Sequence, residues 1–316
     1  MNATIIKLKK ARNFYSDLEI FLSYLLGVDI GGSKADFLLT SDDGLEMSQL
    51  TIPSKNLTNP DTNTVDLLLS KGLDQLSSSV DLKEVSNICL GVAGLHPGNQ
   101  VQLTVLVGQS ISKYTSAKVQ VVNDAVIGFH ALLGHRHGIA LIAGTGSLAA
   151  RIHDYLVIRT AGGTGAKFGD KGSAFWIGKK AIQHILEDSD LGATNPELLK
   201  EFGILSSDSE SSKWELTQYV NKMSNSEVAA LSINVARWAE TLPWAMKILS
   251  DAASNLISLV AQLNPRNEPV ALIGSLFSKN TFIREKVSSE LLEMGLSPEI
   301  VNRPVEGAIK LARLSL

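Results

Sequence analysis

Residues 27–36 read Gly-Val-Asp-Ile-Gly-Gly-Ser-Lys-Ala-Asp and continue the apolar run Ile20–Leu26. This pattern predicts a buried strand, a tight glycine turn and a returning strand, because glycine permits a sharp hairpin whose backbone N–H groups point into the turn. Such N–H groups, together with the hydroxyl of Ser33, suit phosphate oxygens. Asp29, near the end of the first strand, can hold a hydrated Mg²⁺, which prefers a carboxylate plus several waters. For one such motif taken alone, an ordinary hairpin turn is the more frequent explanation.

A second unit of the same form lies at residues 141–148, which read Leu-Ile-Ala-Gly-Thr-Gly-Ser-Leu. Thr145 and Ser147 supply hydroxyls beside the glycines, so this turn also suits phosphate. Two glycine turns, each after an apolar strand, favour a nucleotide site. Other phosphate motifs fail: the sequence has no G-x-x-x-x-G-K-[ST] string, and residues 162–165 neither complete G-x-G-x-x-G nor open a βαβ crossover.

The two units open two similar halves of an α/β protein. Hydrophobic spacing predicts the order β-β-β-α-β-α-β-α, repeated once, with the second copy beginning near Gly138. Residues 174–186 and 215–263 are mainly helical in pattern, so the second half carries a large helical insertion. The Ser-rich stretch 206–212 is expected to be an exposed loop inside that insertion. The similar openings indicate internal duplication.

Length and composition are typical of a soluble globular protein of two domains. The chain has 316 residues, of which 44% are hydrophobic and 19% charged, and its formal charge is −3. No long basic block suggests a nucleic-acid partner. Cys89 is the single cysteine, so it cannot form an internal disulfide or a cysteine-rich metal site, and we expect a small buried core residue.

The N-terminus loosely resembles a signal peptide, because basic residues at 7–12 precede the apolar run Ile20–Leu26. Asp17 and Glu19 interrupt this pattern, and no apolar stretch approaches the ~20 residues that cross a bilayer. We therefore expect an extra helix or a misplaced start, a cytoplasmic location and no membrane partner. A different cluster, His130, His135 and His137, allows metal binding, but a helix end followed by a solvated turn is the expected structure.

Together, the motifs resemble the BadF/BadG/BcrA/BcrD-type ATPase and N-acetylglucosamine kinase family, within the actin/hexokinase/Hsp70 fold group. The resemblance runs from about residue 25 to the end of the chain. Its parts are Gly27–Ser33 (first phosphate motif), Gly144–Ser147 (second phosphate motif), Val270–Ser275 (adenosine motif), residues 163–176 (the family's GGWG…GDEGSAYW loop) and Pro304–Ala308.

The resemblance implies duplicated ribonuclease H-like, actin-like ATPase domains. It divides the chain into an N-terminal extension (1–24), an N-terminal domain (25–135), a C-terminal domain (136–303) and a C-terminal helix (304–316) that packs back on the N-terminal domain. It also implies that ATP, with Mg²⁺, phosphorylates an amino sugar. N-acetylglucosamine, giving the 6-phosphate, is the leading acceptor.

The family's catalytic Asp matches Asp124, which would take the proton from a sugar hydroxyl. An Asn-Asp helix cap before Ala125 is the structural alternative, and both roles can hold. The resemblance implies nucleotide contacts at Gly31, Gly32, Ser33, Lys34, Gly144, Thr145, Gly146, Ser147, Gly274 and Ser275. It implies sugar contacts at Asn56, Asn123, Asp124, Gly163, Thr164 and Asp170. A surface turn at Asn56 and a helix N-terminal charge at Asp170 are alternatives.

Two positions depart from the family's loop and bear on the acceptor. Thr164 stands where many relatives have Trp, and Lys171 replaces the usual Glu. Lys171 could contact an acidic substituent, such as the lactyl group of N-acetylmuramate, which is therefore an alternative acceptor. Glucosamine is a further alternative, and the sequence does not separate N-acetylmannosamine from these sugars.

Proteins of other classes share parts of the pattern. An ATPase activator of a radical dehydratase needs cysteines that bridge a cluster between subunits, and one cysteine argues against it. A repressor-kinase-type sugar protein would carry a Cys-rich zinc motif and DNA-binding helices, which are missing. A nucleotide-gated binding protein is the remaining alternative. A homodimer is common in the family, but nothing in the sequence demonstrates one.

Overall fold

The structure, a computed structural model, describes residues 23–54, 57, 59, 61–132, 135–193, 195–202 and 209–314. It contains two five-stranded sheets with the same layout, in the orders β3-β2-β1-β4-β5 and β10-β9-β6-β7-β8. In each sheet three consecutive strands form an antiparallel meander, and two later strands add in parallel beside the first strand of the meander. This repeated order confirms the predicted duplication of an α/β unit.

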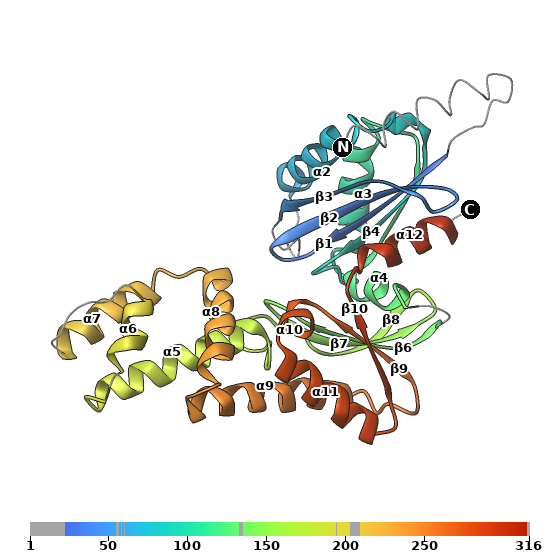
Figure 1. Cartoon of the computed structure of the whole chain (residues 1–316). Helices are drawn as coiled ribbons and strands as arrows, with labels where there is room; N and C mark the ends of the chain where they lie inside the picture. The colour runs from blue at the N-terminus through green and yellow to red at the C-terminus, as the bar shows by residue number, and fades with distance from the viewer. Residues whose placement is uncertain are drawn as a thin grey trace, which may run out of the picture.

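The first sheet and its helices form one lobe, drawn in blue to green in Figure 1. Its elements are β1 (Tyr24–Ile30), β2 (Lys34–Ser41), β3 (Glu46–Pro53), α2 (Thr62–Leu76), η1 (Leu82–Glu84), β4 (Val85–Val92), α3 (Gln100–Ile111), β5 (Lys118–Asn123) and α4 (Asp124–His130). Helices α2 and α3 cover one face of the sheet and bury a continuous apolar core with it. Cys89, on β4, is fully buried, as expected, and burial raises the pKa of its thiol to about 12.

The second sheet carries the helical insertion that the sequence predicts. Its elements are β6 (His137–Ala143), β7 (Ser147–His153), β8 (Leu156–Gly162), α5 (Ala174–Asp190), α6 (Pro196–Glu201), α7 (Ser209–Val220), α8 (Asn225–Trp238), α9 (Pro243–Ala261), β9 (Pro269–Ile273), α10 (Ser275–Lys279), α11 (Thr281–Glu293) and β10 (Ser297–Val301). The last helix, α12 (Val305–Leu314), packs back on β1 and α4 of the first lobe. Helices α5 to α8 extend away from the sheet (Figure 1).

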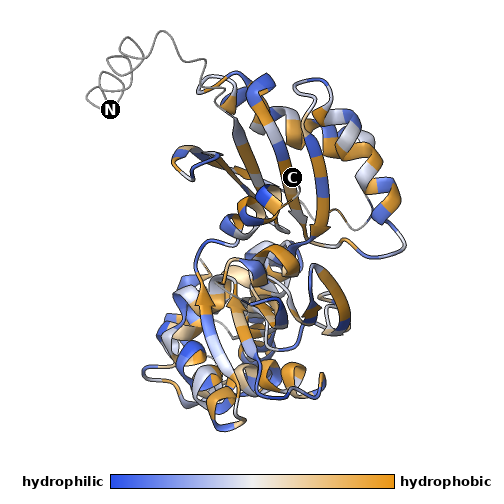
Figure 2. Cartoon of the chain, turned by 90° about the vertical axis from the view of Figure 1, so that its right-hand side faces the viewer, coloured by the Kyte–Doolittle hydropathy of each residue, from blue (hydrophilic) through white to orange (hydrophobic). Residues whose placement is uncertain are grey.

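Helices α4 and α12 join the two lobes. Their buried side chains form a third core with residues of β1, β2, β4, β6, β7 and β9. The helices touch backbone to backbone: a Cβ on Gly307 would lie 1.8 Å from the carbonyl oxygen of Ile127. Figure 2 shows one lobe above the other, and Figure 1 labels α4 and α12 near the level where the lobes meet. Because α4 begins at Asp124, the connection between the lobes starts at the predicted catalytic residue.

Three details of the sequence prediction need comment. Residues Ser209–Ser212 belong to helix α7, so the predicted loop there is wrong for these four positions. Strands β8 and β10 were not identified from the sequence. Both are edge strands whose residues are mostly exposed; the apolar run of β8 is only three residues long (156–158), and β10 has none. The predicted features of residues 1–22 lie outside the described residues.

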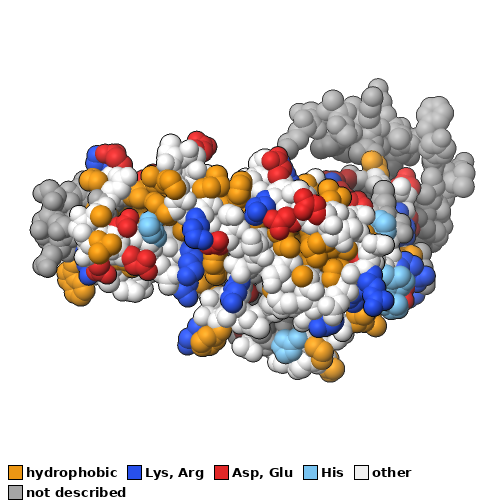
Figure 3. Space-filling view, turned by 90° about the horizontal axis from the view of Figure 1, so that it is seen from below, with side chains coloured by type: hydrophobic (Ala, Val, Ile, Leu, Met, Phe, Trp, Pro, Cys, Tyr) orange, Lys and Arg blue, Asp and Glu red, His pale blue; other side chains and the backbone are white. Residues whose placement is uncertain are grey.

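The surface mixes charges of both signs. On the face seen in Figure 3, acidic, basic and apolar side chains are interspersed, in keeping with a formal charge of −3. Within the part of the chain that the structure describes, no helix is both long and apolar enough to cross a membrane.

Candidate active site

The carboxyl ends of β1, β4 and β5 lie side by side and bring the first glycine turn next to Asp124. Ile30 pairs with Val92, and Val92 pairs with Asn123, in parallel register. Ligands of open α/β sheets bind beyond the carboxyl ends of parallel strands, where connections leave in different directions. Here β1 continues into its hairpin, whereas β5 continues directly into α4.

Asn123 caps helix α4, and Asp124 follows it at the candidate catalytic position. Asn123 is the N-cap of α4: its Oδ1 accepts a hydrogen bond from the backbone N–H of Ala125 at 2.9 Å. Its Nδ2 donates to the carbonyl of Leu95, which ties the cap to the loop after β4. Asp124 occupies the first helical turn and stays partly exposed. Its Oδ1 also accepts from the backbone N–H of Ala125 at 3.0 Å, which leaves Oδ2 as the less engaged oxygen of the carboxylate.

The environment of Asp124 favours the protonated form of its side chain. Burial among protein atoms raises the pKa of Asp124 to about 6, and hydrogen bonds from the backbone N–H groups of Ala125 and Asp124 only partly oppose this. A carboxyl group with a pKa near neutrality can both accept and release a proton under working conditions. This property is common at active sites.

Asp29 lies on β1 close to Asp124 and Asp36. Burial, then the negative charges of Asp124 and Asp36, raises the pKa of Asp29 to about 7, while Lys34 lowers it. Asp29 and Asp36 are direct cross-strand partners in the β1–β2 hairpin. Among the described residues, three carboxylates therefore share this corner with one lysine. Such an excess of negative charge fits a divalent cation with oxygen ligands, as Mg²⁺ requires.

The first glycine turn is exposed and open at its tip. Gly31 donates its backbone N–H to the carbonyl of Lys34 at 2.9 Å, which closes the hairpin. A Cβ on Gly32 would meet no atom of the described residues within 4 Å. Lys34 donates from its ammonium group to Asp36. The turn thus leaves room for a ligand directly above Gly32 and Ser33.

The second glycine turn stands at the equivalent place in the other sheet, between β6 and β7. Gly144 and Thr145 contact the start of α5: Ala174 donates its backbone N–H to the carbonyl of Gly144 at 2.8 Å, and Phe175 donates to that of Thr145 at 3.4 Å. Thr145 is exposed, but Ser147 is buried and donates its hydroxyl to the carbonyl of Lys171. Ser147 therefore fixes the loop that follows, and Thr145 presents the free hydroxyl of the turn.

The residues of the adenosine motif lie against this second turn. β9 runs parallel to β6, so the carboxyl ends of both strands meet. Gly274 has a φ of 112°, and a Cβ there would be 2.5 Å from the carbonyl oxygen of Ala143. The hydroxyl of Ser275 lies 3.9 Å from the position of a Cβ on Gly144. Two of the predicted nucleotide motifs are thus brought together.

The glycine-rich loop after β8 places Asp170 beside the same turn. Asp170 is buried, in a left-handed conformation with φ 51°, and a Cβ on Gly146 would be 3.0 Å from its Oδ2. Burial raises the pKa of Asp170, whereas hydrogen bonds from the backbone N–H groups of Ser147 and Gly165 lower it. Gly163 and Thr164, also in this loop, are exposed.

A hollow of about 180 Å³ opens between this loop and α5. Four lysines line it: Lys167, Lys171, Lys179 and Lys180. Its aromatic side chains are Phe168, Phe175 and Trp176, and the ammonium group of Lys180 lies 5.8 Å from the centre of the Trp176 ring. Lysines over aromatic rings suit an anionic group attached to an apolar body.

One residue of the predicted site lies outside the described residues, and three residues near the candidate site had no predicted role. Asn56 lies outside the described residues. Asp36 was overlooked, although the hairpin register pairs it with Asp29 and its alternation with Lys34 puts both on one face. Lys179 and Lys180 were overlooked because only the fold brings them to the loop.

The chain resembles known proteins along nearly its whole length. It is 24% identical to the N-acetyl-D-glucosamine kinase of Dictyostelium discoideum over 94% of this chain and 98% of that protein. It is 28% identical to the N-acetylmuramic acid/N-acetylglucosamine kinase of Clostridium acetobutylicum over 79% of this chain and 84% of the other.

A solved structure from Chromobacterium violaceum, proposed to be an N-acetylglucosamine kinase, shares the fold with a TM-score of 0.72 at 21% identity, over 92% of this chain and 99% of the other. The sequence profile of the BadF/BadG/BcrA/BcrD ATPase family matches residues 26–312. The chain belongs to the BadF/BadG/BcrA/BcrD ATPase family.

Proposed function

We propose that the chain transfers the terminal phosphoryl group of ATP to a hydroxyl of an amino sugar, with N-acetylglucosamine and its 6-hydroxyl as the leading acceptor. The observation that carries this proposal is the carboxyl group of Asp124, which combines partial exposure with a pKa of about 6 at the carboxyl edge of the first sheet. Likeness to two kinases named for N-acetylglucosamine supports the choice of acceptor.

In the proposed reaction Asp124 accepts the proton of the sugar hydroxyl as its oxygen bonds to the phosphorus of the terminal phosphate. The bond between that phosphorus and the bridging oxygen breaks, and ADP leaves with the bond's electron pair. Asn123 orients Asp124 by fixing the start of α4 through its cap. Asp170, held by the second glycine turn, and the loop residues Gly163 and Thr164 would contact the sugar.

For the nucleotide, the turns Gly31–Ser33 and Gly144–Thr145 would bind phosphates through backbone N–H groups at their tips, and Gly274 and Ser275 would bind the adenosine. The N–H groups of Gly31 and Gly144 themselves close the two hairpins. Asp29 would hold Mg²⁺ through water, and the ion would offset charge on the phosphates when bound. The pKa of Asp29, raised to about 7 by burial and by Asp124 and Asp36, supports this assignment, because a cation would relieve that repulsion.

N-acetylmuramate is a second candidate acceptor. Four lysines surround the hollow beside the loop, and Lys171 stands where the family has Glu. A lactyl carboxylate on the sugar would find a cation there, whereas N-acetylglucosamine carries no charge for it. The C. acetobutylicum relative, named for both sugars, supports testing this pair.

A coupled assay of ADP release tests the proposal. N-acetylglucosamine, glucosamine, N-acetylmuramate and N-acetylmannosamine are compared at equal concentration, with glucose as the unsubstituted control. We expect sugar-dependent ADP release with kcat/KM highest for N-acetylglucosamine. A preference for N-acetylmuramate that Lys171→Glu removes would favour the second candidate. ADP release that no sugar stimulates would contradict both and favour an ATPase or a nucleotide-gated binding protein.

A further inference from the structure

Two histidines and an aspartate converge at the far end of the second sheet from its glycine turn. His137 begins β6, His153 ends β7, and the two are direct partners in the antiparallel register. Directly opposed residues project from the same face of a sheet. Their imidazole rings stack with centroids 4.2 Å apart and an angle of 26° between the planes. Spacing along the sequence groups His137 with His130 and His135, whereas the fold pairs it with His153.

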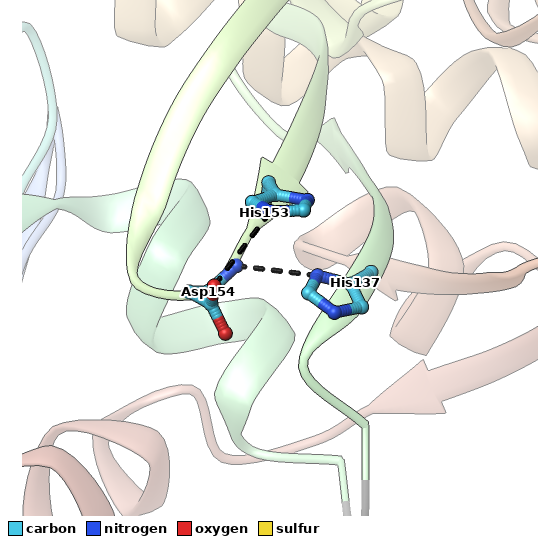
Figure 4. A group of neighbouring side chains, drawn as sticks. All are labelled: His137, His153 and Asp154. Carbon is cyan, nitrogen blue, oxygen red and sulfur yellow. Dashed lines mark hydrogen bonds and ion pairs between the residues drawn. The ribbon is translucent and has the colours of Figure 1, made fainter.

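Asp154 completes the group from the turn between β7 and β8. It is the first residue of the two-residue turn Asp154–Tyr155 and has a φ of 45°, a left-handed conformation that aspartate tolerates better than most side chains. Its backbone N–H lies 3.4 Å from Nδ1 of His137, and its Oδ2 lies 3.7 Å from Nε2 of His153. Figure 4 shows both rings and the carboxylate gathered at this corner.

We propose that His137, His153 and Asp154 form a binding site for a divalent transition-metal ion of the Zn²⁺, Ni²⁺ or Cu²⁺ class. One ligand atom from each residue can be chosen so that all three lie within 4.8 Å of one another. Two ligands of a tetrahedral Zn²⁺ lie about 3.4 Å apart, given Zn–N distances of 2.0–2.1 Å. Small rotations of exposed side chains close this difference, and water completes the coordination.

The donor set selects the class of ion. Two imidazole nitrogens and one carboxylate oxygen suit Zn²⁺, Ni²⁺ and Cu²⁺, whereas Mg²⁺ and Ca²⁺ take oxygen ligands almost entirely. The site is therefore chemically distinct from the corner around Asp29. It does not depend on the proposed kinase activity.

Arg136 both supports and weakens the site. Its Nε lies 3.0 Å from Oδ1 of Asp154, so it orients the carboxylate and leaves Oδ2 toward His153. Its positive charge also opposes a cation. Both histidines are exposed and Asp154 is partly exposed. These features predict an exchangeable site rather than a permanent structural one.

The turn that carries the site packs against the helix that joins the lobes. Tyr155, next to Asp154, lies 4.9 Å from His130 between ring centroids, and His130 is the last residue of α4. A bound ion would therefore stiffen the hairpin at the C-terminal end of α4, whose other end carries Asp124.

Titration of the full-length, untagged, metal-stripped protein with Zn²⁺ tests the proposal by calorimetry. We expect one Zn²⁺ per chain at this site, displaced by Ni²⁺ but not by excess Mg²⁺. His137→Ala, His153→Ala and Asp154→Asn should each lower the affinity about tenfold or more. Asn tolerates the left-handed conformation at 154, so the last variant should keep the wild-type melting temperature.

His184→Ala is the matched control. His184 also faces a carboxylate, with its Nε2 3.6 Å from Oδ2 of Asp188, but it forms no part of the three-ligand group. It should bind Zn²⁺ like the wild type. Absence of Zn²⁺ binding by the wild type, or unchanged affinity in a folded His137→Ala/His153→Ala double variant, would overturn the proposal.

Discussion

Burial, and after it the negative charge of Asp124, raises the pKa of Asp29, although the two residues come from different elements, the start of α4 and the end of β1. The parallel register of β1, β4 and β5 creates this proximity. Two acidic groups that resist ionisation stand together at one edge of the sheet. They suit different tasks: Asp124 a proton transfer, and Asp29 a cation.

The pH dependence of the reaction follows from the pKa of Asp124. Because a general base must be ionised, activity should fall as the pH drops through about 6, the pKa that burial gives this group. We expect kcat/KM for the sugar to decrease about tenfold per pH unit below that value and to level off above it. Initial rates at saturating Mg²⁺ and ATP measure this. A flat profile between pH 5 and about 8 would exclude this carboxyl as the base.

Asp124 should also reduce the stability of the fold at neutral pH. Its pKa is raised in the folded chain from 3.8 to about 6, so the folded state binds the proton more tightly than the unfolded state. The stabilising contribution of Asp124 to the free energy of unfolding is therefore complete below about pH 4, and it is lost as the pH rises through about 6. Asp124→Asn removes this loss and should raise the free energy of unfolding at pH 8 by about 1–3 kcal/mol.

Denaturant titrations at pH 8 and at pH 4 measure this difference. At pH 4 wild type and Asp124→Asn should unfold at nearly the same denaturant concentration. A variant that is less stable than the wild type at pH 8 would show that the ionised carboxylate supports the fold.

Substitution of Gly32 can test contact with the nucleotide without disturbing the fold. A methyl group there would meet no atom within 4 Å in the part of the chain that the structure describes. The φ of Gly32 is not in the left-handed region, so Gly32→Ala should leave the melting temperature unchanged. If the turn holds phosphates, the same methyl group displaces them, and kcat/KM for ATP should fall about tenfold to a hundredfold. Steady-state kinetics and thermal unfolding of the same preparation measure kcat/KM for ATP and the melting temperature. Unchanged kinetics would mean that the nucleotide does not approach this turn.

The contact between α4 and α12 should tolerate no side chain at Gly307. A Cβ would lie 1.8 Å from the carbonyl oxygen of Ile127 and 2.7 Å from the backbone nitrogen of Ala131. Gly307→Ala should therefore destabilise the chain by about 3 kcal/mol, at the upper end of overpacking effects.

Gly108→Ala is the control for helix propensity. Gly108 lies in α3 with nothing within 4 Å of a Cβ, so alanine should stabilise by about 0.5–1 kcal/mol. Chemical denaturation compares the two variants. If both substitutions changed the free energy of unfolding by the same amount, α4 and α12 would not pack as closely as described.

The central strands of the fold were predictable because they are apolar on both faces. β1, β4, β6 and β9 each form a short hydrophobic run that ends at a polar or glycine turn. The edge strand β10 was not predictable, because it contains Pro298 and its residues are mostly exposed. Its place follows only from the strand order of the complete sheet.

The position of the candidate site in the fold was predictable where its residues lie on one hairpin or at one strand end, as with Gly31–Ser33 and Asp124. Their roles stay predictions. It was not predictable where the fold assembles distant residues. The hollow with Lys179 and Lys180, and the pairing of His137 with His153, depend on a helix face and on a register that no local motif encodes.

Turnover and nucleotide affinity of Asp124→Asn test the central claim most directly. The substitution preserves size and the start of α4 but removes the proton acceptor. We predict that kcat with N-acetylglucosamine falls at least about a hundredfold, while the Kd for ADP, measured by calorimetry, stays within about twofold because Asp124 is not one of the proposed nucleotide contacts. A variant that phosphorylates the sugar at the wild-type rate would contradict the account.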